Sequence, residues 1–333
     1  MSINKSNIVF NTKFSPDVIL SRPKRFISDK SYIQNFIGKD NKTGYCISDT
    51  KNFLGDSSLL VHSLINKSVD EEIVENYIRN SIVTDVGPSG RSEYIFKQSI
   101  KNKPNSLDLN ETISSSLILK RNCVNDISPN KLNEFFYSIW FRFSPNINNY
   151  LNCSYYLNKS ITLFQIRSGG YNNNVDIGDY RVSLGIFKDN EGLYYKLSGD
   201  NFANGKGYIP EISEYNLTNP YWRQRTRSSN ILFNTWYKLE VYIKKPDDFY
   251  DIKNGVVWCA ITPGIKQQRI VIGHKIGGIQ IGELNLPDTK FYLGNNSYYT
   301  DSPLSTEYTD LIIRDTLPMD SSERFNNNTM YDY

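Results

Sequence analysis

Histidine, cysteine and long apolar runs are all scarce in this chain of 333 residues. The four cysteines, Cys46, Cys123, Cys153 and Cys259, are widely separated, and with only two histidines in the chain they form no zinc-binding spacing. We therefore expect reduced, mostly buried thiols and no bound metal. No segment approaches the roughly 18 apolar residues that a membrane-spanning helix needs, so we expect no membrane partner.

A strong excess of charge of one sign is also missing. The chain has 38 Lys and Arg against 35 Asp and Glu, a net charge of +3, which argues against general nucleic-acid binding. The glycine pairs at 169–170 and 277–278 lack the strand-to-helix context of a phosphate site, and we expect no cofactor. The first ten residues contain no apolar signal segment, so we expect synthesis in the cytosol, with any release by lysis or assembly.

Aromatic residues, by contrast, make up 14% of the chain. Tyr and Phe suit a pleated, half-buried surface and so favour β structure, although AT-rich codon usage would produce a similar composition. The segment Phe135–Phe143 is a long aromatic run that ends before a Ser-Pro pair, and it predicts a central strand. Shorter strand-like segments alternate with turn residues such as Asp189–Gly192. The pattern predicts an all-β, antiparallel jelly-roll sandwich.

Composition divides the chain into three predicted parts. Residues 83–318 carry the strand signals and form the jelly-roll domain. Residues 1–82 read as an N-terminal arm with a short helix over 68–78, in which Ser68 would be the N-cap and acidic residues would occupy the first turn. Residues 319–333 read as a C-terminal tail.

Three motifs occur in order along the predicted sandwich. Gly90–Tyr94 opens an early strand, Leu163–Arg167 ends a central strand, and Lys290–Tyr298 lies near the C-terminus. Together they resemble motifs of the alginate lyases and related polysaccharide lyases, whose concanavalin-like jelly rolls carry such strands along one concave groove. Residues 234–241 and 255–258 resemble two further strands of that group. The resemblance implies the same fold, and an acidic polysaccharide or a host surface glycan as the partner.

The resemblance also implies roles for single residues. Such lyases remove a proton next to a uronic carboxylate, which an amide or guanidinium neutralises while a His or Tyr moves the proton. By position, Arg91 and Gln165 would bind the carboxylate, and Tyr298 would be the catalytic acid, or Tyr292 if the register differs. Where the lyases place their histidine, this chain has Arg167, which stays protonated and cannot act as an ordinary base.

Other interpretations of these side chains stay open. Arg167 suits a binding groove, because guanidinium groups pair with carboxylates through two hydrogen bonds. Arg91, Glu93 and Arg167 could instead form cross-strand ion pairs on a sheet face. An arginine-rich segment around Trp222 could stack on sugar rings or form a solvated loop anchored by that tryptophan. The candidate substrate-binding residues are therefore Arg167, Glu93, Tyr292, Trp222 and Arg223.

Two classes of function fit this sequence. The missing base and the missing signal segment favour a structural or carbohydrate-binding surface protein, a lyase-like module on a virion such as that of a bacteriophage. Its partners would include other virion subunits, and a homotrimer is expected by analogy. The alternative is an active polysaccharide lyase that cleaves an acidic polysaccharide by β-elimination, so whether the chain is an enzyme stays open. A third interpretation is an intracellular jelly roll with a partner of its own.

Overall fold

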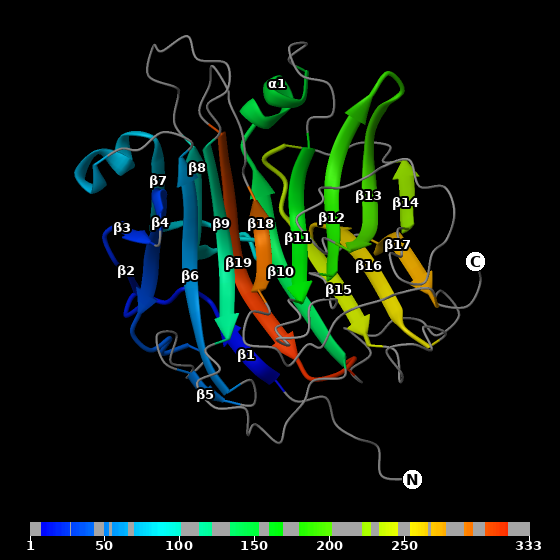
Figure 1. Ribbon diagram of the computed structural model, residues 1–333, viewed down its shortest axis with the longest axis horizontal. Helices are drawn as coiled ribbons and strands as arrows, with labels where there is room; N and C mark the ends of the chain where they lie inside the picture. The colour runs from blue at the N-terminus through cyan, green and yellow to red at the C-terminus, as the bar shows by residue number, and fades with distance from the viewer. Residues whose placement is uncertain are drawn as a thin grey trace.

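The structure is a computed structural model in which two antiparallel sheets lie face to face as layers (Figure 1). Within the described residues, no helix is long and apolar enough to cross a membrane. The predicted all-β antiparallel sandwich is confirmed. The described residues are 8–26, 28–42, 50–52, 55–65, 70–100, 113–121, 134–152, 160–168, 180–201, 222–227, 233–245, 254–265, 268–277, 290–295 and 304–318.

One layer is an eight-stranded sheet in which β10, the predicted central strand, lies between β15 and β19. A further strand, β1, pairs with β19 beside this path. In spatial order, the strands are β17 (Ile270–Ile276), β16 (Val256–Pro263), β15 (Tyr237–Lys244), β10 (Glu134–Phe143), β19 (Leu304–Arg314), β8 (Ser92–Ile100) and β7 (Ile78–Val86), with β1 at Ile8–Thr12.

The other layer is an eleven-stranded sheet with the segment around Gln165 near its middle. Two short strands, β3 (Lys24–Phe26) and β5 (Thr50–Asn52), pair with β4 and β6 beside the main path. The main path runs through β14 (Trp222–Arg227), β13 (Gly192–Asn201), β12 (Tyr180–Asp189), β11 (Ser160–Ser168), β18 (Lys290–Asn295), β9 (Ile113–Arg121), β6 (Gly55–Ile65), β4 (Ser28–Ile37) and β2 (Ile19–Leu20).

Alternate residues of β10 build the core between the two layers. Every second residue from Phe135 to Phe143 belongs to the main buried cluster, as expected when side chains of a strand point alternately to its two faces. The Phe164 ring of the opposite sheet lies with its centroid 6.5 Å from that of Phe135 and 5.3 Å from that of Tyr137. Each such buried aromatic side chain contributes about 1.5–3 kcal/mol of transfer free energy.

Residues between 8 and 82 also contribute strands to both sheets, which differs from the predicted N-terminal arm. β1 pairs with β19, while β6 pairs with both β4 and β9. Phe14 and Phe36 are fully buried, and each has its ring centroid within 5.6 Å of that of Phe96. This part of the chain joins the sandwich because its aromatic side chains complete one end of the core.

The predicted helix over 68–78 is observed as a shorter 3-10 helix, η1, from Glu71 to Asn76. Asp70 stands at its N-cap, and Ser68 lies outside the described residues. Val74 and Tyr77 are buried with Tyr32 in a small separate cluster, which docks the helix on the sandwich. A short helix that was not predicted, α1 (Asn146–Asn152), lies at one end of the strands (Figure 1). The predicted tail, 319–333, lies outside the described residues.

Candidate functional site

Gln165 and Tyr292 occupy neighbouring positions near the middle of the eleven-stranded sheet. The Cα of Gln165 in β11 pairs with that of Tyr292 in β18 on one side and with that of Ser183 in β12 on the other. Phe164 and Ile166, the neighbours of Gln165 in the chain, are buried in the core. Because faces alternate along a strand, Gln165 and its paired positions belong to the outer face of this sheet. Tyr298 lies outside the described residues.

Four basic residues occupy paired positions in one row across this outer face. Arg167, two residues after Gln165, pairs through its Cα with Arg181 in β12 and with Lys290 in β18. Lys290 in turn pairs with Lys120 in β9. Adjacent strands lie about 4.8 Å apart, so the row extends over about 14 Å perpendicular to the strands.

The edge strand β14 adds three exposed arginines to the same face. Arg223 pairs with Ser198, Arg225 with Lys196, and Arg227 with Tyr194 of β13. The guanidinium groups of Arg225 and Arg227 lie 5.0 and 5.4 Å from the centroid of the Tyr194 ring. Sequence reasoning missed Arg181 and Lys120, which stand in no motif.

Arg227 is the arginine of β14 that is neutralised locally. It forms ion pairs with Asp189, at 2.7 Å, and with Glu191, both at the β12–β13 turn. The hydrogen bond from Arg227 lowers the pKa of the Asp189 carboxyl below its usual value. Within the described part of the chain, neither Arg223 nor Arg225 forms an ion pair with a carboxylate. These two arginines keep their charge available for a ligand.

Trp222 points into the core rather than outward. It is 8% exposed and belongs to the main buried cluster, and the predicted loop around it is strand β14. A Cβ at Gly199, its paired position on β13, would collide with the Trp222 indole. Trp222 therefore holds β14 on the sandwich and leaves Arg223 at the surface.

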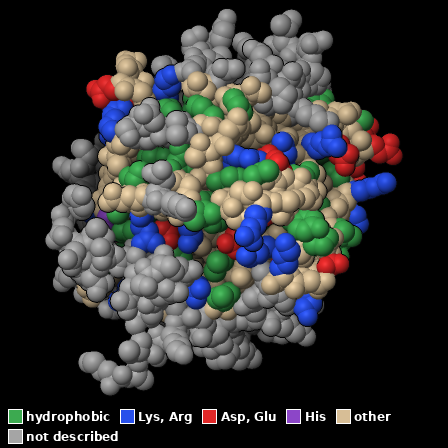
Figure 2. Space-filling model, turned by 180° about the vertical axis from the view of Figure 1, so that it is seen from behind, with side chains coloured by type: hydrophobic (Ala, Val, Ile, Leu, Met, Phe, Trp, Pro, Cys, Tyr) green, Lys and Arg blue, Asp and Glu red, His purple; other side chains and the backbone are tan. Residues whose placement is uncertain are grey.

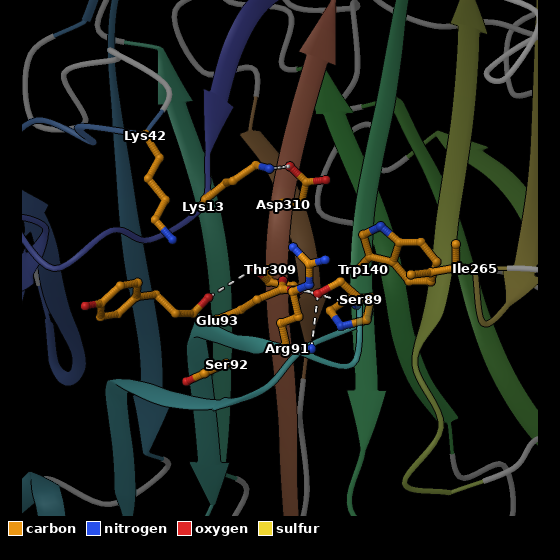
Figure 3. A pocket seen from close by; sticks show the side chains of 12 residues that line it. Lys13, Lys42, Ser89, Arg91, Ser92, Glu93, Trp140, Ile265, Thr309 and Asp310 are labelled. Atoms are coloured by element: carbon orange, nitrogen blue, oxygen red, sulfur yellow. Dashed lines mark hydrogen bonds and ion pairs between the residues drawn. The ribbon is translucent and has the colours of Figure 1, made fainter.

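Arg91 and Glu93 lie on the other sheet, so the structure does not bring them together with Gln165 and Arg167. Both are near the turn between β7 and β8 in the eight-stranded sheet. Glu93 accepts hydrogen bonds from the backbone amide of Ser89, at 3.3 Å, and from its hydroxyl. The described contacts of Glu93 are thus within its own turn. Arg91 and Glu93 line a separate pocket, which Figure 3 shows.

Neither histidine is adjacent to Gln165. His62 in β6 lies three strands away, about 14 Å, and contacts the hydroxyl of Ser31. His274 lies in β17 of the other sheet, where burial lowers the pKa of its imidazole. Among the described residues, no three His, Cys, Asp or Glu side chains are grouped closely enough to hold a metal ion. The chemistry offered by the outer face is therefore that of cations, amides, hydroxyls and a phenol.

Comparisons with known proteins give likenesses to solved structures at low identity. No family model matches the chain, and no curated protein matches it. The PL-14 alginate lyase from Aplysia kurodai is 9% identical, with a TM-score of 0.41, over 70% of this chain and 86% of the lyase. The alginate lyase vAL-1 from Chlorella virus is 10% identical, with a TM-score of 0.40, over 74% and 97%.

A seed lectin of Lotus tetragonolobus is 9% identical, with a TM-score of 0.33, over 71% of this chain and 91% of the lectin. By its own strand order, the chain is an all-β antiparallel sandwich of two sheets.

Proposed function

We propose that this protein binds an acidic polysaccharide across the outer face of the eleven-stranded sheet. The observation that carries the proposal is the row of Lys120, Lys290, Arg167 and Arg181 at paired positions on four consecutive strands. Like charges at directly opposite positions destabilise a sheet, and the acid of the chain that continues this row, Asp200, stands opposite Arg181 at one end. A polymer with repeated carboxylates supplies anions at intervals along its length.

The neighbouring row supplies the polar groups that a sugar needs besides charge. Gln165 pairs with Ser183, which pairs with Ser198, and the two serine hydroxyls are 3.2 Å apart. On the other side of Tyr292 the row continues through Ile118 and Leu60, which are buried outside the main core cluster. The amide and the two hydroxyls match the hydroxyls of a pyranose, whereas the buried Ile118 and Leu60 pack within the protein.

Arg223 and Arg225 extend the positive charge to the edge of the sheet, and they make the proposal testable. We expect wild-type protein to bind alginate, glucuronan or heparin with an affinity that falls as salt rises. Replacing both arginines, as Arg223→Ser with Arg225→Ser, should weaken binding about tenfold, since two charge-assisted contacts are lost.

The matched control is Arg22→Ser with Arg79→Ser, which removes the same charge from exposed positions elsewhere. We expect the control to bind like the wild type in isothermal titration calorimetry. Equal weakening by both double variants would reduce the effect to net charge and contradict a site on this face. No binding of any polyuronide by the wild type would also overturn the proposal.

A second candidate function, β-elimination, is favoured by the pairing of Gln165 with Tyr292. In such an elimination an amide neutralises a carboxylate while a phenol transfers a proton, and these two positions carry residues of those two types. An active lyase would produce an unsaturated sugar, seen as ultraviolet absorbance, and Tyr292→Phe would abolish this turnover while keeping binding. Binding without any such absorbance would leave a carbohydrate-binding module.

The biological setting of this binding stays a prediction from the sequence. A surface role on a virion, other virion subunits as partners and a homotrimer are all compatible with a module whose outer sheet face is occupied by glycan. Sedimentation of the purified chain tests the homotrimer directly.

A further inference from the structure

The pocket lined by Arg91 and Glu93 lies on the outer side of the eight-stranded sheet, on the opposite layer from the face described above. It has a volume of about 490 Å³, within the range of about 300–1,000 Å³ that small-molecule sites occupy. Its walls come from the end of β1, the β7–β8 turn, β10 and β19, which are distant in sequence (Figure 3). The residues that matter for its chemistry are Lys13, Lys42, Arg91, Trp140, Glu93 and Asp310.

A β-bulge brings Asp310 into this pocket. Trp140 of β10 pairs with Thr309, but Ser138 pairs with Ile312, so one extra residue of β19 stands opposite Ile139. Asp310 adopts φ of 51°, in the left-handed region that non-glycine residues seldom occupy. Bulges of this kind redirect side chains and are frequent beside binding sites. Here Thr309 and Asp310 both line the pocket although they are adjacent in a strand.

One buried carboxylate holds the backbone of both lysines at the rim. Asp40 is fully buried, and it accepts hydrogen bonds from the backbone amides of Lys13, at 2.6 Å, and Lys42, at 2.9 Å. Two chain segments that are far apart in sequence are thereby fixed beside each other. A rim fixed in this way loses little conformational freedom when a ligand binds.

The charges around the pocket are not balanced. Lys13 pairs with Asp310 at 3.8 Å, and Glu93 is engaged by Ser89. Lys42 lies with its ammonium group 5.1 Å from the centroid of the Tyr94 ring. Among the residues that the structure describes, no carboxylate forms an ion pair with Lys42 or Arg91. With Lys13 and Asp310 paired, the cations Lys42 and Arg91 outnumber the one further carboxylate of the lining, Glu93.

We propose that this pocket binds a single carboxylate-bearing sugar unit. Lys42 and Arg91 provide the counter-charge for the carboxylate. The half-exposed Trp140, with Ile265 beside it, offers an apolar platform for a ring face (Figure 3). Glu93, Asp310 and the serines of the β7–β8 turn offer oxygen atoms to the sugar hydroxyls. A simple inorganic anion would use the cations alone and leave the indole without a role.

The test uses the full chain and D-glucuronate as the probe, with D-glucose and acetate as comparators, in a ligand-observed NMR titration. For a ligand of this size we expect a Kd of about 1 mM for glucuronate and binding at least about tenfold weaker for both comparators. Lys42→Gln and Trp140→Ala should each weaken glucuronate binding about tenfold. The matched control is Lys39→Gln, an exposed lysine in the same segment that does not line the pocket, and it should bind as the wild type does.

Three results would overturn this proposal. The first is no saturable glucuronate binding, and the second is acetate binding as tight as that of glucuronate with no effect of Trp140→Ala. The third is glucuronate binding that is lost in the Arg223→Ser, Arg225→Ser protein and kept in Lys42→Gln, because the sugar would then lie on the eleven-stranded sheet. Polysaccharide binding through that sheet is measured separately, so either proposal can fail while the other stands. Unchanged thermal unfolding of each variant shows that the losses concern binding and not folding.

Discussion

The carboxylate of Asp40 lies 2.6 Å from the backbone amide nitrogen of Lys13 and is fully buried. Burial alone would raise the pKa of this carboxyl, but hydrogen bonds from the Thr12 hydroxyl and from the amides of Lys13 and Lys42 bring it below its usual value. A lowered pKa in the folded state means that the ionised form stabilises the fold.

This relationship predicts a specific acid sensitivity. The stabilisation is present above the unfolded-state pKa of about 3.9 and is lost as the pH falls through the lower folded-state value. We expect Asp40→Asn to lose about 1–3 kcal/mol of unfolding free energy at neutral pH, because one acceptor oxygen is replaced by a donor. Urea unfolding measured from pH 6 to pH 3 should show a smaller loss of stability in the variant than in the wild type.

Asp70→Asn is the control for that experiment, since the Asp70 side chain is 87% exposed. It should leave the stability nearly unchanged at every pH. Parallel stability curves for the wild type and Asp40→Asn would show that Asp40 has no role in acid unfolding.

A second buried carboxylate, Glu240, depends on Arg269. The Nε and Nη2 atoms of Arg269 lie 2.7 and 2.9 Å from the two oxygens of Glu240, which is fully buried, while Lys238 is at 3.6 Å. Removing one member of such a pair leaves a buried charge, so Arg269→Met should cost about 3 kcal/mol in chemical denaturation. Arg227→Met, which breaks exposed ion pairs, should leave the stability nearly unchanged. Similar costs for both variants would contradict this distinction.

Gly199 is required by the indole of Trp222 packed against it. Because a Cβ at this position would overlap the ring, Gly199→Ala should destabilise the protein by about 1–3 kcal/mol. A double-mutant cycle with Trp222→Leu checks the cause, since the alanine should cost much less once the indole is absent. Additive effects of the two substitutions would show that the glycine is needed for another reason.

The strands with uninterrupted patterns could be predicted from the sequence, whereas pairings between distant segments could not. β10 was predictable because apolar residues continue on both of its faces, one toward the core and one toward a small outer cluster of Phe136, Tyr242 and Trp258. β1 pairs with β19, near the opposite end of the chain, and no local pattern records such a partner. Prolines and basic residues around Arg22–Arg25 predicted an extended arm. Phe14 before this segment and Phe36 after it are nevertheless buried in the core.

The candidate site was predictable only where a local sequence pattern marked a strand. The motifs placed Gln165 and Tyr292 on strands, and the structure pairs them. The order of motifs along a chain does not say which sheet each strand joins, so Arg91 was grouped with Gln165 although it lies on the opposite layer. Arg181 and Lys120 become part of the basic row through register alone, which depends on pairings across four strands.

Lysine footprinting is the most direct test of the claim that an acidic polysaccharide lies across the outer face of the eleven-stranded sheet. The protein is acetylated briefly with and without saturating glucuronan, and the modification of each lysine is measured by mass spectrometry. Lys120 and Lys290, in the basic row, should be protected several-fold by the polymer, while Lys24 and Lys39 should be modified equally in both samples. Equal modification of Lys120 and Lys290 with and without bound polymer would contradict the proposed site.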